Sequence, residues 1–169
     1  MYIRSMKRML FFAFLILVFI SCKDQKQISV EDGSSEYELS TEKWPKKLPV
    51  NSNAQAILND WKEFKAFETT FDALYNVENK DDLALAIDDL IEKQKDLVAS
   101  TYPDKFDIPQ IRSRQKIFKT YMLKIKGDLF YRLDPQESIL QMFEAYNAFR
   151  NQFNVVVNNT LDTNLILEE

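Results

Sequence analysis

Few side chains in this sequence belong to the types that usually carry out chemistry. The chain has no histidine and a single cysteine, Cys22. The lack of histidine excludes Ser-His-Asp and Cys-His catalysis, HExxH metal sites, CxxCH haem attachment and Glu-x-x-His di-iron sites. Glu68 could act as a lone carboxylate, but no second carboxylate, nucleophile or metal-ligand cluster joins it. We therefore expect no metal, no cofactor and no enzymatic activity.

Four polar side chains occupy positions where the periodicity of the sequence calls for apolar ones, namely Glu68, Gln94, Gln115 and Arg150. Counting outward from the turns places Glu68 and Arg150 at one depth or one layer apart, with the two glutamines similarly close. A lone buried charge costs several kcal/mol, so opposite charges at one depth should pair. We expect a Glu68–Arg150 ion pair with the two amides nearby. A device that sets helix register is the preferred interpretation, and a ligand site is the alternative.

A group of basic residues lies near the start of the third helix that the sequence predicts. Its members are Arg112, Arg114, Lys116 and Lys119. The simpler interpretation is a solvated helix face. The alternative is a docking patch for an acidic partner or for phosphate groups at a membrane surface.

Cys22 ends an uncharged apolar run, residues 9–22, which follows the basic residues Arg4, Lys7 and Arg8. A basic start, a short apolar core and a small residue before a cut describe a secretory signal peptide. A run of about 13 apolar residues is too short for a bilayer, which needs about 20. The sequence therefore predicts that residues 1–21 are a removable leader.

Residues 19–22, Phe-Ile-Ser-Cys, resemble the lipobox of bacterial lipoproteins. In that family the cysteine sulfur receives a diacylglycerol, the peptide before it is cut, and the new amino group is acylated. The resemblance implies a lipid anchor at Cys22 that holds the chain on a membrane without a spanning helix. Lys23 and Asp24 look like part of the surface-export signal of Bacteroidetes lipoproteins. The resemblance thus implies an outer-membrane lipoprotein of the cell envelope, either periplasmic or surface-exposed.

The composition limits the fold and the partners. A chain of 169 residues suits one domain once a leader and a tether are removed. With 2 glycines and 5 prolines it has few turn formers, which favours a few long helices over a many-stranded sandwich. The net charge of −4 disfavours nucleic acid and anionic lipid head groups as partners.

The rest of the chain divides into a tether and a helical domain. Residues 22–50 mix charged and small residues and are predicted to be a flexible tether, with Trp44 covering the first helix. Residues 51–169 should form the domain. Apolar residues spaced by three and four predict helices over about 52–77, 80–100, 108–129 and 135–161. Short connections then predict an all-α, antiparallel up-down-up-down four-helix bundle.

The whole chain is similar to small helical lipoproteins of Bacteroidetes, especially flavobacteria, of the kind labelled "viral A-type inclusion protein". That label implies no activity. The leading hypothesis is a membrane-anchored structural or interaction module that binds another envelope protein. The alternative is a binder of a small apolar molecule between the helices, which predicts a cavity beside Glu68 and Arg150.

Overall fold

The computed structural model describes residue 39 and residues 41–159, and this part of the chain is all-helical without a β-strand. The all-α prediction is confirmed. The predicted leader, Cys22 and most of the predicted tether lie outside the described residues. None of the described helices is both long enough and apolar enough to cross a membrane. The described α-helices are α2 (Ser52–Asp60), α3 (Lys62–Ala73), α4 (Lys80–Ala99), α5 (Pro109–Phe130) and α6 (Gln136–Asn158), with 3-10 turns η1 (Leu74–Asn76) and η2 (Asp104–Phe106).

The described residues thus contain five α-helices where the sequence predicted four, because the first predicted helix breaks at Trp61. The backbone of Trp61 is extended, with φ −89° and ψ 94°, so this residue ends α2 and precedes α3. Its buried indole donates from Nε1 to the Ser100 Oγ at 2.8 Å and lies 4.7 Å from the Tyr102 ring. These contacts with a distant loop position the break.

Two asparagine caps explain where helices begin. The side-chain oxygen of Asn51 accepts from the Ala54 N–H at 2.8 Å at the start of α2. At the start of α4, the Asn79 oxygen accepts from the Asp82 N–H at 2.9 Å. Each asparagine satisfies one of the donors that the first turn of a helix leaves without a partner.

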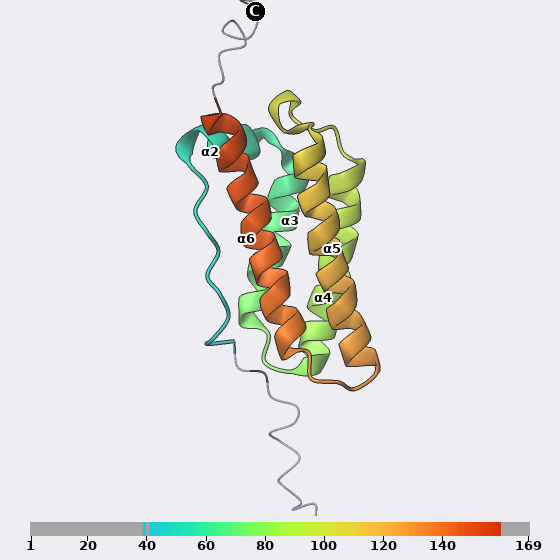
Figure 1. Cartoon of the computed structure of the whole chain (residues 1–169). Helices are drawn as coiled ribbons and strands as arrows, with labels where there is room; N and C mark the ends of the chain where they lie inside the picture. Colours follow the sequence, from blue (N-terminus) through green and yellow to red (C-terminus); the bar gives the residue numbers. More distant parts are fainter. Residues whose placement is uncertain (1–38, 40, 160–169) are drawn as a thin grey trace, which may run out of the picture. The chain divides into compact units, whose positions relative to one another are not determined.

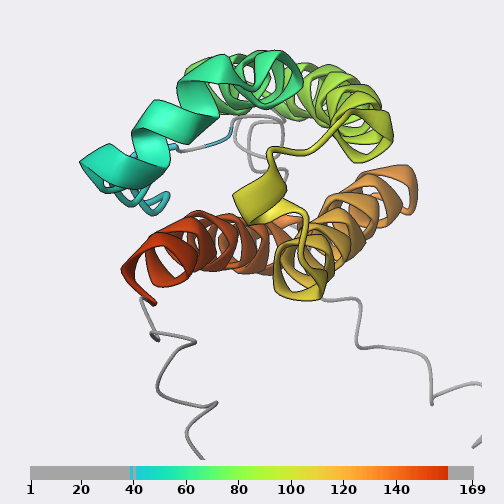
Figure 2. The same ribbon diagram turned by 90° about the horizontal axis from the view of Figure 1, so that it is seen from above.

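Helices that follow one another in the chain are neighbours in space. Contacts join α3 to α4, α4 to α5 and α5 to α6, and α2 also contacts α6. Figure 1 shows α3 to α6 running side by side, with α2 inclined at one end. Figure 2 looks along these helices and shows α3 and α4 on one side facing α6 and α5 on the other.

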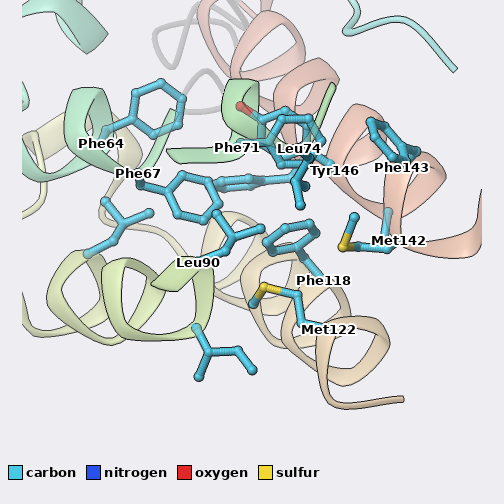
Figure 3. Packing of buried hydrophobic residues seen from close by; sticks show 14 of the residues in the cluster. Phe64, Phe67, Phe71, Leu74, Leu90, Phe118, Met122, Met142, Phe143 and Tyr146 are labelled. Atoms are coloured by element: carbon cyan, nitrogen blue, oxygen red, sulfur yellow. The ribbon is translucent and has the colours of Figure 1, made fainter. Parts of the chain in front are cut away.

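The core is built mainly from aromatic rings. The Phe71 ring stacks on Tyr146 with centroids 3.6 Å apart, and Phe67 meets Phe118 edge to face at 5.6 Å. These rings come from α3, α5 and α6, and Figure 3 shows them converging in the interior. Burying each large ring contributes about 1.5–3 kcal/mol, so apolar packing provides the main stabilisation. The fully buried aromatic residues are Phe64, Phe67, Phe71, Phe106, Phe118, Phe143, Tyr146, Phe149 and Phe153.

The segment before α2 packs against the helices, and we call residues 44–51 the strap. Trp44 is buried, with its ring 5.3 Å from that of Phe143 in α6, a contact with the last helix that was not predicted. The Tyr75 hydroxyl donates to the carbonyl of Pro45 at 2.8 Å. Residues from Trp44 onward therefore belong to the packed body, although the sequence placed them in the tether.

Candidate functional site

The ion pair predicted from the sequence is present. Glu68 projects from α3 and Arg150 from α6, and the Arg150 Nη1 donates to the Glu68 Oε1. The Arg150 side chain is 5% exposed, whereas that of Glu68 is 20% exposed. The pair therefore lies at the edge of the core, where α3 and α6 meet, and not at its centre.

The strap completes the surroundings of this pair. The Arg150 Nε donates to the carbonyl of Leu48 at 2.6 Å. From the same segment, the Lys47 Nζ lies 3.5 Å from the Glu68 Oε1 and 2.6 Å from the Asp72 Oδ1. Two cations and two carboxylates thus alternate between α3, α6 and the strap. The strap occupies the position beside Glu68 and Arg150 where the ligand hypothesis required a cavity.

Asparagines on one face of α6 bind the backbone of the strap on either side of Arg150. Asn147 accepts from the Leu48 N–H at 2.8 Å and donates to the Lys46 carbonyl at 3.0 Å. Asn154 accepts from the Asn51 N–H at 2.8 Å and donates to the Pro49 carbonyl at 3.2 Å. An extended segment leaves its backbone groups without partners, and this row of side chains supplies them.

Both glutamines are buried at the inward positions that the sequence predicted, but they do not join the ion pair. Gln115 accepts a hydrogen bond from the Tyr102 hydroxyl, and neither amide bonds to Glu68 or Arg150 among the described residues. In this part of the chain, the Gln94 Oε1 and the Gln115 Nε2 are buried without a hydrogen-bond partner. Arg150 instead donates to the strap, and aromatic rings of α3, α5 and α6 pack together in the interior.

Burial changes the acidity of the tyrosines near these polar groups. Desolvation raises the pKa of Tyr146 far above its ordinary value, although the nearby Arg150 charge acts in the opposite direction. Burial also raises the pKa of Tyr75, whose hydroxyl binds the strap, and of Tyr102, in spite of its hydrogen bond to Gln115. All three hydroxyls are therefore neutral at physiological pH.

Three of the four basic residues of α5, Arg112, Lys116 and Lys119, follow one another at spacings of four and three residues and therefore share one helix face. Arg112 binds the Asp107 carboxylate at 2.6 Å, and its guanidinium lies 4.1 Å from the centre of the Tyr102 ring. Arg114 is exposed two residues further on and therefore projects from a different face of the helix. Lys119 lies toward α4. Lys116 is exposed between Arg112 and Lys119 on that shared face, and a docking role for this face stays a prediction.

An open groove of about 680 Å³ runs between α4 and α5, and sequence reasoning missed it. Its apolar residues are Ile91, which is buried, and Leu123, which is 49% exposed. The Lys126 Nζ and the Asp88 Oδ1, which form an ion pair 2.6 Å apart, are part of the lining of the groove. The acidic residues on α4 and the lysines on α5 are visible in the sequence and could have indicated that these two helix faces lie together. The lining residues are Asp88, Asp89, Ile91, Glu92, Lys95, Lys119, Leu123 and Lys126.

Comparison with known proteins adds no relative to this description. No family model, curated protein or solved structure matches the chain. Among the described residues, no three or more cysteine, aspartate or glutamate side chains gather in a way that could hold a metal ion. The strap with its ion pair and the α4–α5 groove are the two candidate sites.

Proposed function

We propose that this chain is a lipoprotein anchored in the outer membrane through Cys22, and that it binds another envelope protein without catalysing a reaction. The lipobox-like residues 19–22 support the anchor. In this proposal α2 and α3 count as one interrupted helix. The packed body is then an antiparallel up-down-up-down four-helix bundle. The contacts of α3 with α4, of α4 with α5 and of α5 with α6 support this arrangement.

The observation that carries the binding role is the groove between α4 and α5. Leu123 is half-exposed within it, and charged side chains of both signs surround the apolar floor. Covering such an apolar floor with a partner removes it from water, which stabilises the complex. The positive and negative side chains around the floor favour a partner with complementary charges. The occupant that fits is a helix or loop of a protein with an apolar side chain between charged ones.

A binder of a small apolar molecule is less well supported by the contacts. That alternative places the molecule beside Glu68 and Arg150, where the strap carbonyl of Leu48 accepts from Arg150. The adjacent interior holds the rings of Phe71 and Tyr146 stacked on one another. A ligand there would have to displace the strap or these rings, whereas a partner protein needs no rearrangement to reach the groove.

Site-specific crosslinking in the native envelope tests the binding role. A photo-crosslinking residue at Leu123 should trap one partner, and the same residue at Val155, which is 40% exposed on α6, serves as the control. Lys119→Glu reverses a charge in the groove and should abolish the Leu123 adduct. Equal adducts from both positions, or an adduct unaffected by Lys119→Glu, would contradict docking in the groove.

Membrane fractionation of Cys22→Ser tests the anchor. Without the sulfur no diacylglycerol can be attached, so the variant should leave the membrane fraction and lack the mass of the acyl chains. Mass spectrometry of the unaltered chain should find the leader removed and Cys22 acylated. An intact leader with a free thiol, or unchanged fractionation of the variant, would refute the lipoprotein assignment.

A further inference from the structure

The turn between α5 and α6 exposes three large apolar side chains within four residues. Phe130 is 78% exposed, Tyr131 71% and Leu133 55%. The two rings meet edge to face with centroids 5.0 Å apart. Isolated exposed apolar residues are common on soluble proteins, but a contiguous group of this kind marks a surface that contacts something else.

Backbone hydrogen bonds hold this turn, and burial does not. Arg132 has a positive φ of 55°, and the N–H groups of Arg132 and Leu133 donate to the carbonyls of Leu129 and Asp128, at 3.2 and 2.8 Å. These two bonds form a Schellman motif, the common C-terminal cap of a helix. In this motif the residue at the place of Leu133 normally packs on an apolar side chain five residues earlier. Here that position is Asp128, so Leu133 has no apolar partner there. The apolar side chains therefore project from a fixed backbone.

The register of α5 against α4 places this turn at a known end of the helices. The Lys126–Asp88 ion pair joins the two helices. Phe130 lies four residues beyond Lys126, and α4 begins at Lys80, eight residues before Asp88. Each residue advances a helix by about 1.5 Å, so the turn and the start of α4 lie at the same end. Figure 1 shows both connections at the lower end of the helices.

The chain enters the packed body at that same end. The Leu39 N–H donates to the carbonyl of Glu78 at 3.1 Å, just before α4. Only residues 23–38 separate Leu39 from Cys22, and this stretch spans at most about 60 Å when fully extended. A lipid on Cys22 would therefore hold the end that carries Phe130 and Tyr131 within reach of the membrane.

We propose that the α5–α6 turn inserts Phe130, Tyr131 and Leu133 into the headgroup region of the membrane in which Cys22 is anchored. This second contact rests on the proposed lipid anchor. Together the two contacts orient the helices and leave the α4–α5 groove open to a partner. An anchor on a tether restricts position alone, whereas an anchor and an inserted turn also restrict orientation.

The side chains of the turn fit the interface of a bilayer. Aromatic rings and leucine favour the boundary between headgroups and acyl chains, where the Tyr131 hydroxyl can remain hydrated. Arg132 is exposed, forms no ion pair among the described residues, and can approach lipid phosphates. The nearby carboxylates of Asp81, Asp134 and Glu137 are exposed and repel anionic headgroups. The surface that fits is therefore a zwitterionic one.

A fluorescent reporter on the lipidated full chain tests this contact. Acylation occupies the Cys22 sulfur, so Tyr131→Cys introduces one free thiol for an environment-sensitive dye, and Val98→Cys provides a control near the other end of α4. The labelled proteins are reconstituted in phosphatidylcholine vesicles with or without phosphatidylglycerol. The dye at position 131 should shift its emission to the blue and resist quenching by aqueous iodide. The dye at position 98 should do neither, and phosphatidylglycerol should not enhance the effect.

Each contrary result has its own meaning. If neither protein floats with the vesicles, the lipid anchor fails and the membrane contact fails with it. If both float but the two dyes are quenched equally, the contact is refuted while the anchor stands. If the dye at position 131 is shielded in native membranes and not in lipid vesicles, the turn binds a protein and the lipid proposal is overturned.

Discussion

Arg150 is a buried cation whose partners come from two other parts of the chain. Its Nη1 donates to Glu68 on α3, and its Nε donates to the Leu48 carbonyl in the strap. Removing one side of such an arrangement leaves the other groups desolvated and without partners, which costs more than the arrangement itself contributes. Arg150 therefore matters for holding three segments together.

A double-mutant cycle on Glu68 and Arg150 measures this coupling. We expect Arg150→Met to lower the free energy of unfolding by about 3 kcal/mol, and Glu68→Gln to cost less because it is partly solvated. Their coupling should be about 1 kcal/mol or more in urea denaturation. The exposed pair Glu92–Lys95 is the matched control and should couple by less than about 0.5 kcal/mol. Additive losses for Glu68 and Arg150 would contradict the assigned role.

Tyr146 should make the protein sensitive to alkaline pH. Burial raises the pKa of Tyr146 in the folded state. Ionisation of this tyrosine therefore leaves the free energy of unfolding unchanged below about pH 10, the pKa of an unfolded tyrosine. Above that pH the unfolded chain releases the proton first, and stability falls by about 1.4 kcal/mol per pH unit. Tyr146→Phe should reduce this loss in denaturation curves recorded from pH 8 to 11.

The same substitution gives a second readout at neutral pH. The Tyr146 hydroxyl is buried without a hydrogen-bond partner among the described residues. Replacing a hydroxyl of this kind by hydrogen removes a desolvated polar group, so the stability at pH 7 should be unchanged or higher by about 1 kcal/mol. A clear loss of stability would show that the hydroxyl has a partner.

At the scale of elements, the break at Trp61 is maintained by a loop distant in the sequence. Its indole N–H donates to Ser100, directly after α4, and its ring contacts Tyr102. Trp61 thus connects the α2–α3 junction to the α4–α5 connection. Because both contacts involve residues about 40 positions away, no pattern within residues 52–77 reveals the break.

Ser100→Ala tests whether that hydrogen bond stabilises the junction. The variant leaves a buried indole donor without a partner, so the free energy of unfolding should fall by about 1–3 kcal/mol. Thr69→Ala on the surface of α3 is the control, because its hydroxyl only bonds back to Lys65 in its own helix. Thermal denaturation of the two variants should differ, and equal small effects would argue that the indole N–H reaches water.

For the whole molecule, the strap fastens the N-terminal part of the packed body to the helices. Its residues bind α3 through Lys47 and bind α6 through five backbone groups, and Trp44 within it is buried. A domain cut at residue 51, as the sequence predicted, would expose the ring of Phe143 and leave Arg150 without one acceptor.

Comparing chains 39–169 and 51–169 tests the role of the strap. Loss of Trp44 alone should cost about 3–5 kcal/mol, which is a large share of the 5–15 kcal/mol of a typical domain. The shorter chain should therefore unfold at much lower urea concentration, or fail to fold. A chain starting at residue 23 controls for the residues before 39 and should match the 39–169 chain. Equal midpoints for all three would show that the strap is dispensable.

The sequence by itself determined the all-helical class, because the hydrogen bonds of a helix are local and its buried face repeats every three or four residues. Counting along those repeats was also sufficient to pair Glu68 with Arg150 across the fold. Both results depend on regular geometry, which residue numbers record directly.

The tertiary structure alone decided which groups surround that pair. Periodicity places Gln94 and Gln115 at inward positions, but the direction of Arg150 depends on the Leu48 carbonyl about 100 residues earlier. The exposure of Phe130 was likewise decided by tertiary structure, since it stands one residue past Leu129, the last residue of α5 that packs against the core. Contacts between distant segments depend on how the helices pack, and packing is a property of the assembled core.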